Sequence, residues 1–212
     1  MHEIIGTNNQ INISDSLNLD IRIFGDKNTI DIDKTCNLTG RLVIYGNNTT
    51  TKIDKNVRGK IIVDIGGSNG RNADFCQFII DENTTFGETY FQLMEKGSKI
   101  HIGKNCIFAR NIYVYCSDTH SVIDLDGNLL NQGRFVDIGD HVWVGRDAHI
   151  GKNISIAKNI VIGWNSVVTK SFDKNNCIIA GNPAKIVKEN INWNGNCPDM
   201  YLTKNPDAKV IG

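Results

Sequence analysis

The chain has 212 residues with 23 basic and 23 acidic side chains, so its formal net charge at pH 7 is zero. Nucleic-acid binders present a basic face, and a neutral chain is not expected to bind nucleic acid. No stretch approaches the ~18 consecutive apolar residues that a membrane-spanning helix requires. The first ten residues lack the basic region and apolar run of a signal peptide. We therefore expect a cytoplasmic protein without a membrane span.

The six cysteines include no CxxC pair, so their spacing indicates neither a zinc site nor a redox motif. Without a secretion signal, free thiols are the expected state. The 20 glycines and three prolines of this asparagine-rich chain favour short strands joined by turns over long helices.

Residues 1–70 repeat a loose pattern. A glycine, a polar turn containing asparagine and alternating aliphatic residues recur from Gly6, Gly25 and Gly46. Asparagine and glycine are the residues that tolerate left-handed turn conformations. We interpret these segments as coils of a β-helix with one or two extra residues at a corner. A separate small β-sandwich is the alternative.

A strict repeat begins near residue 100, where Ile102, Phe108 and Val114 fall on every sixth position. The residues two positions before each of these should also face inward. Cys106 is one of them, and we therefore expect it to be a core residue without a catalytic role.

The repeat stops over residues 117–135, which read SDTHSVIDLDGNLLNQGRF. Continuing by sixes would place His120, Asp126 and Gln132 on inward aliphatic positions, so we expect a loop that leaves the coil. An irregular polar loop in a rigid solenoid is a frequent place for function. Histidine is the side chain most often used as a general base near neutral pH. His120 is thus the catalytic candidate, and Asp118 could raise its basicity or fix its tautomer.

The repeat returns over residues 138–169. A period of six fits neither a helix nor an ordinary strand, and three sides of six residues form a triangular parallel β-helix. Small residues follow most of the aliphatic positions, and we expect glycine there to turn each corner through a positive φ. The inward aliphatic positions are Ile138, Val144, Ile150, Ile156, Ile162 and Val168.

Two tryptophans, Trp143 and Trp164, occupy outward positions of this repeat. An outward tryptophan on a polar solenoid needs a neighbouring subunit, a ligand or the loop to cover it. Lys170 and Lys185 lie beside turns where the repeat ends, and each is either a surface charge or a ligand contact. His141 and His149 do not stand in stacked positions of the repeat, so we expect no zinc site.

We divide the chain into a β-helix domain at residues 1–170 and a C-terminal cap and tail at residues 171–212. Residues 184–190 could form a short helix, and the rest of the tail is expected to be loop or extended chain. A β-helix needs its open end covered to avoid an exposed edge, and this tail is the candidate cap.

Several segments together resemble the left-handed β-helix hexapeptide acyltransferases: SDTHSVIDLDG, VDIGDHVWVGRDAHI, IGWNSVVTK and AGNPAKIVKENINW. The similarity is greatest to the branch that O-acetylates bacterial surface sugars of capsule, lipopolysaccharide or sialic-acid type. It is strong over about residues 97–193 and weak over the N-terminal third. It alone implies left-handed coils, since steric rules favour right-handed crossovers. It also implies acetyl-CoA as co-substrate without a bound cofactor, a glycan hydroxyl as acceptor, and a homotrimer with active sites between subunits.

The resemblance gives individual residues a role. His120 matches the family's general base, which takes the proton of the acceptor hydroxyl. Trp143 matches the tryptophan that holds the donor or stabilises the oxyanion, and it is expected to face the same cleft as His120. Trp164 replaces a small residue that lines the coenzyme channel. The other donor-binding matches are Gly145 and Arg146 at pantetheine and Thr169, Lys170 and Lys185 at the phosphates.

Two other functions remain open from the sequence. An N-acetyltransferase for a nucleotide-linked amino sugar would need a uridine-binding module, and residues 1–90 contain no glycine-rich strand-to-helix turn. A non-catalytic β-helix that binds ice would need long threonine ladders, which this chain lacks. Tyr113, Tyr115 and Arg134 flank the expected cleft and are either sugar contacts or surface residues.

Overall fold

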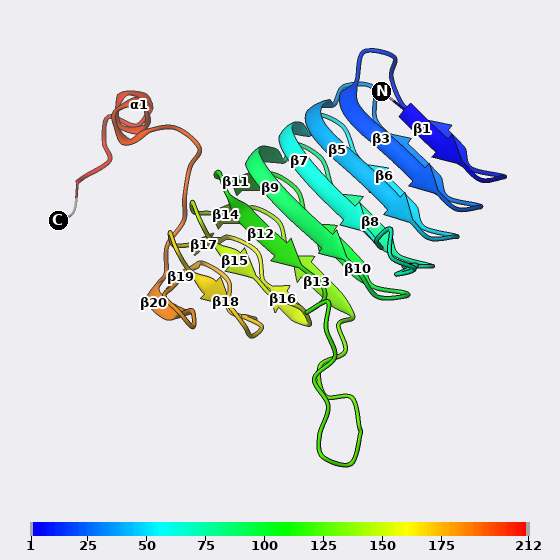
Figure 1. The fold of residues 1–212 in the computed structure, drawn as a ribbon. Helices are drawn as coiled ribbons and strands as arrows, with labels where there is room; N and C mark the ends of the chain where they lie inside the picture. Colours follow the sequence, from blue (N-terminus) through cyan, green and yellow to red (C-terminus); the bar gives the residue numbers. More distant parts are fainter. Residues whose placement is uncertain (1, 211–212) are drawn as a thin grey trace.

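The computed structural model describes residues 2–210, in which parallel strands stack into a solenoid (Figure 1). One sheet has 13 strands. Its N-terminal members are β1 (His2–Ile5), β3 (Asn18–Phe24), β5 (Asn37–Tyr45), β7 (Arg58–Ile65) and β9 (Thr85–Leu93). Its later members are β11 (Ile107–Phe108), β12 (Ile112–Tyr115), β14 (Trp143–Val144), β15 (His149–Ile150), β17 (Ile160–Ile162), β18 (Val167–Val168), β19 (Cys177–Ala180) and β20 (Lys185–Glu189).

The second sheet has seven strands and forms the remaining side of the solenoid. They are β2 (Gln10–Asn12), β4 (Thr29–Ile32), β6 (Thr50–Ile53), β8 (Gln77–Ile80), β10 (Lys99–Ile102), β13 (Phe135–Ile138) and β16 (Ile154–Ile156).

The pairing register confirms the predicted coil. Val136 pairs with Ile154, Trp143 with Val161 and His149 with Val167, a step of 18 residues on each of three sides. The sides are the stack that contains β10, β13 and β16, the stack that contains β11, β14 and β17, and the stack that contains β12, β15 and β18.

The predicted inward positions form the core. All six aliphatic residues of the later repeat are at most 3% exposed. Each such side chain contributes roughly 1.5–3 kcal/mol through burial. Cys106 is fully buried, as predicted, and burial raises the pKa of its thiol to about 12.

The expectation about the corner glycines is wrong. The left-handed residue lies two positions later, for example at His141 (φ 56°), Asp147 (φ 60°) and Asn153 (φ 58°). The glycines are needed for close approach instead, because a Cβ at Gly139 would lie 3.0 Å from the carbonyl oxygen of Ile156 in the next coil. The position after each aliphatic residue therefore favours a small residue because the next coil lies so close. The position two residues later favours asparagine because its backbone is left-handed.

The N-terminal third continues the same solenoid, so the β-sandwich alternative is wrong. Strand β9 pairs with both β11 and β12. One long strand of an N-terminal coil therefore spans two sides of the solenoid, whereas later coils use a separate short strand on each side. The long strands bend at glycines with positive φ, Gly40 (φ 108°) and Gly59 (φ 116°). The first coil steps by 19 residues, as in the pairing of Gln10 with Thr29, and the next by 21, as in the pairing of Thr29 with Thr50.

One coil is longer than the sequence pattern suggested. Thr50 pairs with Gln77, a step of 27 residues, because residues 66–75 leave the coil between β7 and β8. This second excursion and the predicted loop after β12 start from the same edge of the solenoid, where the chain passes into the second sheet.

The C-terminal segment differs from the prediction. Residues 184–190 do not form a helix, because β20 pairs antiparallel with β19 and covers its open edge. The tail then runs back along the coils, and Trp193 stacks on His141 at 4.1 Å between ring centroids. The helix is α1 (Pro198–Lys204), which stands apart from the strands with no buried residue (Figure 1). No helix within residues 2–210 is long and apolar enough to cross a membrane.

Replacing Gly59 with alanine should destabilise the solenoid strongly. An added Cβ would lie 1.7 Å from the Phe86 carbonyl oxygen, and the positive φ adds about 1–2 kcal/mol of strain. Gly97→Ala is the matched control, since Gly97 has φ +73° but open space around its Cβ position. We expect the control to lower the melting temperature by about 2–8 °C and Gly59→Ala by clearly more. Equal shifts in thermal unfolding would contradict the close approach of these coils.

Candidate active site

The loop between β12 and β13 projects from the solenoid as a hairpin (Figure 1). Ile123 and Leu129 form an antiparallel bridge. At the tip, the Asp124 carboxylate accepts hydrogen bonds from the side chain and backbone of Asn128, and these bonds lower the pKa of Asp124. The hairpin is thus an ordered arm.

A single carboxylate holds both ends of this arm. Glu95, which follows β9, accepts a hydrogen bond from Ser117 Oγ at 2.8 Å. Both of its oxygens also accept the backbone N–H of Gly133 at 3.0 Å. The start and the end of the loop are therefore fixed to the coil above it.

The backbone around His120 is held on several sides. Thr119 has φ 67° and donates its hydroxyl to Gln92 Oε1 at 3.2 Å, while its N–H donates to Ser117 Oγ. Asn131 Nδ2 donates to the His120 carbonyl at 2.8 Å. The His120 side chain itself is exposed, and no side chain among residues 2–210 hydrogen-bonds its ring. A rigid backbone thus presents a free imidazole.

Asp118 does not orient the His120 ring, contrary to the possibility raised by the sequence. Its carboxylate accepts hydrogen bonds from Lys152 Nζ and, at 2.8 Å, from Asn131 Nδ2. The bond from Lys152, followed by that from Asn131, lowers the pKa of Asp118. Asp118 instead joins the loop to the corner after β15, where Lys152 lies.

Two grooves lie on either side of the loop base and share Ser117 and Thr119 as lining residues. We call the first the His120 groove, with a volume of about 320 Å³. It is lined by Gly70, Arg71, Asn72, Met94, Glu95, Ser117, Thr119, His120, Ser121, Leu129, Asn131 and Gln132. We call the second the Tyr113 groove, with a volume of about 420 Å³. It is lined by Gln92, Tyr113, Tyr115, Ser117, Asp118, Thr119, His149, Ile150, Gly151, Val167, Val168 and Thr169.

Stacked rings form the floor of the Tyr113 groove. Tyr113 stacks on Tyr90 at 4.8 Å and on His149 at 4.9 Å between centroids. Burial, followed by the nearby Tyr113 and Asp64, raises the pKa of Tyr115, so its hydroxyl keeps its proton at neutral pH. Tyr113 and Tyr115 thus flank the loop base, as expected. Arg134 donates to Gln132 Oε1 at 2.7 Å beside the His120 groove.

The predicted donor-binding residues occupy two different edges of the chain. Thr169 and Lys170 follow β18 on the edge that carries the loop, and Lys170 lies 5.6 Å from the Phe172 ring. Gly145 and Arg146, between β14 and β15, and Trp164, after β17, lie on the next edge.

Trp143 and Lys185 also lie away from the loop edge. Trp143 points outward from β14 and packs at 6.1 Å from Trp193. Lys185 begins β20, where it pairs with Ala180. His120 and Trp143 therefore do not meet within one copy of the chain, since one stands on the loop edge and the other on the β11–β14–β17 side.

Trp164 lies directly over Gly145. A Cβ at Gly145 would be 2.6 Å from Cδ1 of the Trp164 ring. The indole is 72% exposed, so the large residue that replaces a small one in the family pattern covers the coil surface and still presents a face outward.

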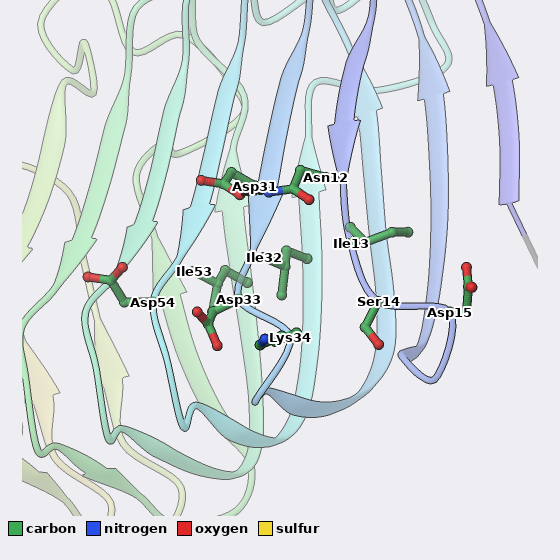
Figure 2. A pocket seen from close by; sticks show the side chains of 10 residues that line it. All are labelled: Asn12, Ile13, Ser14, Asp15, Asp31, Ile32, Asp33, Lys34, Ile53 and Asp54. Carbon is green, nitrogen blue, oxygen red and sulfur yellow. Dashed lines mark hydrogen bonds between the residues drawn. The ribbon is translucent and has the colours of Figure 1, made fainter.

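A further groove, of about 580 Å³, lies at the N-terminal coils (Figure 2). Figure 2 shows the carboxylates of Asp31, Asp33 and Asp54 along this groove, which Lys34 also lines. Hydrogen bonds from Thr35 lower the pKa of Asp33, which therefore stays charged. These carboxylates disfavour an anionic ligand, and this groove is not the candidate site. Within residues 2–210, no group of three or more potential ligands is arranged to hold a metal ion.

Comparisons with known proteins assign the family, although no family model matches the chain. A polysialic acid O-acetyltransferase from Neisseria meningitidis is 37% identical over 198 residues, which cover 91% of this chain and 89% of the relative. The chain belongs to the polysialic acid O-acetyltransferase family. It is accordingly an acyltransferase, as the sequence motifs predicted.

Solved structures of this family confirm the predicted left-handed parallel β-helix. The polysialic acid O-acetyltransferase OatWY superimposes with a TM-score of 0.85 at 34% identity, over 98% of this chain and 97% of OatWY. The polySia-specific acetyltransferase NeuO gives a TM-score of 0.80 at 26% identity, over 97% of this chain and 98% of NeuO. Both comparisons include the N-terminal coils, where the sequence resemblance was weak.

The structure of this polysialic acid O-acetyltransferase homologue also shows residues that hold or line the site and that the sequence did not indicate. Glu95, Asn131 and Lys152 hold the loop, yet each comes from a different coil or loop strand and gives no local signal. Arg71 is different, because the run Gly66-Gly67-Ser68-Asn69-Gly70 before it is a recognisable break in the repeat.

Replacing Lys152 with methionine should release the loop and raise the pKa of Asp118. Because the pKa of Asp118 is lowered in the folded protein, the ion pair stabilises the loop fully at pH values above the ordinary pKa of 3.8. This stabilisation is lost as the pH falls through the lowered pKa. Carboxyl NMR titration should place the wild-type midpoint below 3.8 and the variant midpoint higher. Loop amides of the variant should exchange faster at neutral pH. Lys158→Met, which removes an exposed lysine from another edge, is the control. An unchanged Asp118 midpoint in Lys152→Met would contradict this role.

Proposed function

We propose that this enzyme transfers an acetyl group from acetyl-CoA to a hydroxyl of a sialic-acid polymer of a bacterial capsule, with His120 as general base. The observation that carries the proposal is the free imidazole of His120 on a backbone held by Gln92, Glu95 and Asn131. Support for the acceptor comes from the relatives, which are named for polysialic acid. Because acetyl-CoA is the donor, the reaction takes place in the cytoplasm.

The proposed reaction is a direct transfer. The acceptor hydroxyl oxygen attacks the thioester carbonyl carbon while a ring nitrogen of His120 takes the hydroxyl proton. The tetrahedral intermediate then loses the thiolate, the carbon–sulfur bond breaks, and the imidazolium returns the proton to sulfur. An acyl-enzyme on Cys106 or Cys116 is disfavoured, because burial raises the pKa values of these thiols to about 12 and both side chains are inaccessible.

The donor site is completed by a neighbouring copy of the chain. His120 and Thr169 lie on one edge of the solenoid, whereas Trp143, Gly145 and Trp164 lie elsewhere on it. The Trp143 indole N–H has no acceptor among residues 2–210, so it is available to the thioester oxyanion. Arg146, Lys170 and Lys185 supply the positive charges for the coenzyme phosphates.

A closed homotrimer brings the two edges together. The projecting hairpin supports this assembly, because it carries apolar side chains that are between 51% and 107% exposed in one copy. Such a surface is expected to be covered by a partner. These residues are Val122, Ile123, Leu125, Leu129 and Leu130.

His120→Ala should abolish acetyl transfer while leaving coenzyme binding intact. Loss of a general base lowers turnover by about 10²–10⁴-fold. Thiol release with polysialic acid as acceptor measures transfer, and calorimetry with CoA measures binding. His101→Gln removes an imidazole from the β10 side and should retain activity. Full activity in His120→Ala would rule out the proposed base.

Mixed oligomers test the shared site. His120→Ala and Trp143→Ala should each be inactive alone. When they are co-expressed in equal amounts and associate at random, about one quarter of the interfaces combine an intact His120 with an intact Trp143 of the neighbour. Activity should recover to about that fraction of wild type. No recovery, despite demonstrated mixed oligomers, would place both residues of a site on one chain.

A further inference from the structure

The excursion at residues 66–75 is the second break in the solenoid. It leaves after β7 and returns before β8, and it closes on itself through a bridge between Gly67 and Arg71, with Gly67 N–H donating to the Arg71 carbonyl at 2.9 Å. The turn after β9 carries Glu95, and the catalytic loop follows one coil later. All three segments belong to one edge, and all three contribute to the His120 groove.

Arg71 is the basic residue that lines the His120 groove. Its side chain is exposed, and no carboxylate among residues 2–210 forms an ion pair with it. Other arginines of the N-terminal coils are occupied: Arg22 pairs with Asp20 at 2.8 Å and Arg41 with Asp64 at 3.0 Å. Glu95 lines the same groove, but its oxygens are engaged by Ser117 and Gly133.

The rest of the groove has the composition of a sugar site. Asn72, Ser121 and Gln132 offer amide and hydroxyl groups, and Met94 and Leu129 offer an apolar face. The volume of about 320 Å³ lies at the lower end of the roughly 300–1,000 Å³ typical of small-molecule sites, so it suits one monosaccharide unit.

We propose that Arg71 binds the carboxylate of the sugar unit whose hydroxyl faces His120. A guanidinium can donate two parallel hydrogen bonds to a carboxylate, which fixes orientation as well as charge. Sialic acid carries one carboxylate per unit, so this contact selects an acidic sugar over a neutral one and places the unit against the base. The assignment rests on the proposed function and identifies the residue that recognises its acceptor. Arg71 is in this sense a specificity residue.

The test compares binding of a short oligosialic acid with its carboxyl-reduced, neutral form by calorimetry. Wild type should bind the acidic form about 10- to 100-fold more tightly, the range for one charge-assisted pair of hydrogen bonds. Arg71→Gln should lose that preference, and Arg71→Lys should retain part of it. Arg22→Gln, which removes the same charge from β3 outside the groove, should behave as wild type. In turnover, Arg71→Gln should raise KM for the polymer and change kcat little.

The outcomes separate this assignment from the acceptor itself. If wild type and Arg71→Gln bind the acidic oligomer equally well, Arg71 is not the carboxylate partner and the acceptor proposal stands. If wild type binds neither form, the sialic-acid acceptor is wrong and the assignment fails with it. A loss of the circular dichroism signal in Arg71→Gln would indicate that Arg71 stabilises the fold. A structural role alone would be excluded if Arg71→Lys still binds the acidic oligomer more tightly than the reduced one.

Discussion

Neighbouring coils of this protein are hydrogen-bonded in parallel register, and their backbones approach so closely that several positions admit only a glycine. Glycines such as Gly59 and Gly139 permit the close approach, and aliphatic side chains fill the interior. The coils accommodate a few additional residues, as the steps of 18 and 21 residues show, and longer additions leave the solenoid at an edge. The two large excursions, at residues 66–75 and in the loop before β13, leave from the same edge, and the candidate site lies where they meet.

Charged hydrogen bonds convert the longer excursion into a positioned arm. Glu95 joins both ends of the loop to the coil, and Asp118 joins it to Lys152. The carboxylates are thus used to fix the backbone around His120, and the imidazole remains free for a substrate. The carboxylate two residues from the histidine therefore has structural partners, Lys152 and Asn131, and does not contact the imidazole as the sequence had allowed.

The prism shape also explains why one chain holds the expected residues on separated surfaces. A triangular solenoid has three sides, and the side that carries Trp143 does not border the edge that carries His120. The proposed site, which uses both His120 and Trp143, for this reason requires a second copy of the chain, and the exposed apolar hairpin is consistent with such an assembly.

The sequence by itself determined the fold, the inward positions and the place of the loop that carries His120, because a period of six is a local property of the chain. Its family motifs also identified an acyltransferase, which the relatives confirm. The roles of His120, Trp143 and the donor-binding residues stay predictions. Only the tertiary structure decided that His141 and Asn153 adopt the left-handed turns, that residues 185–189 form a strand, and that Glu95 and Lys152 hold the loop. It likewise placed Arg71 in the groove of His120. These contacts join residues tens of positions apart, across coils whose stacking register no local pattern specifies.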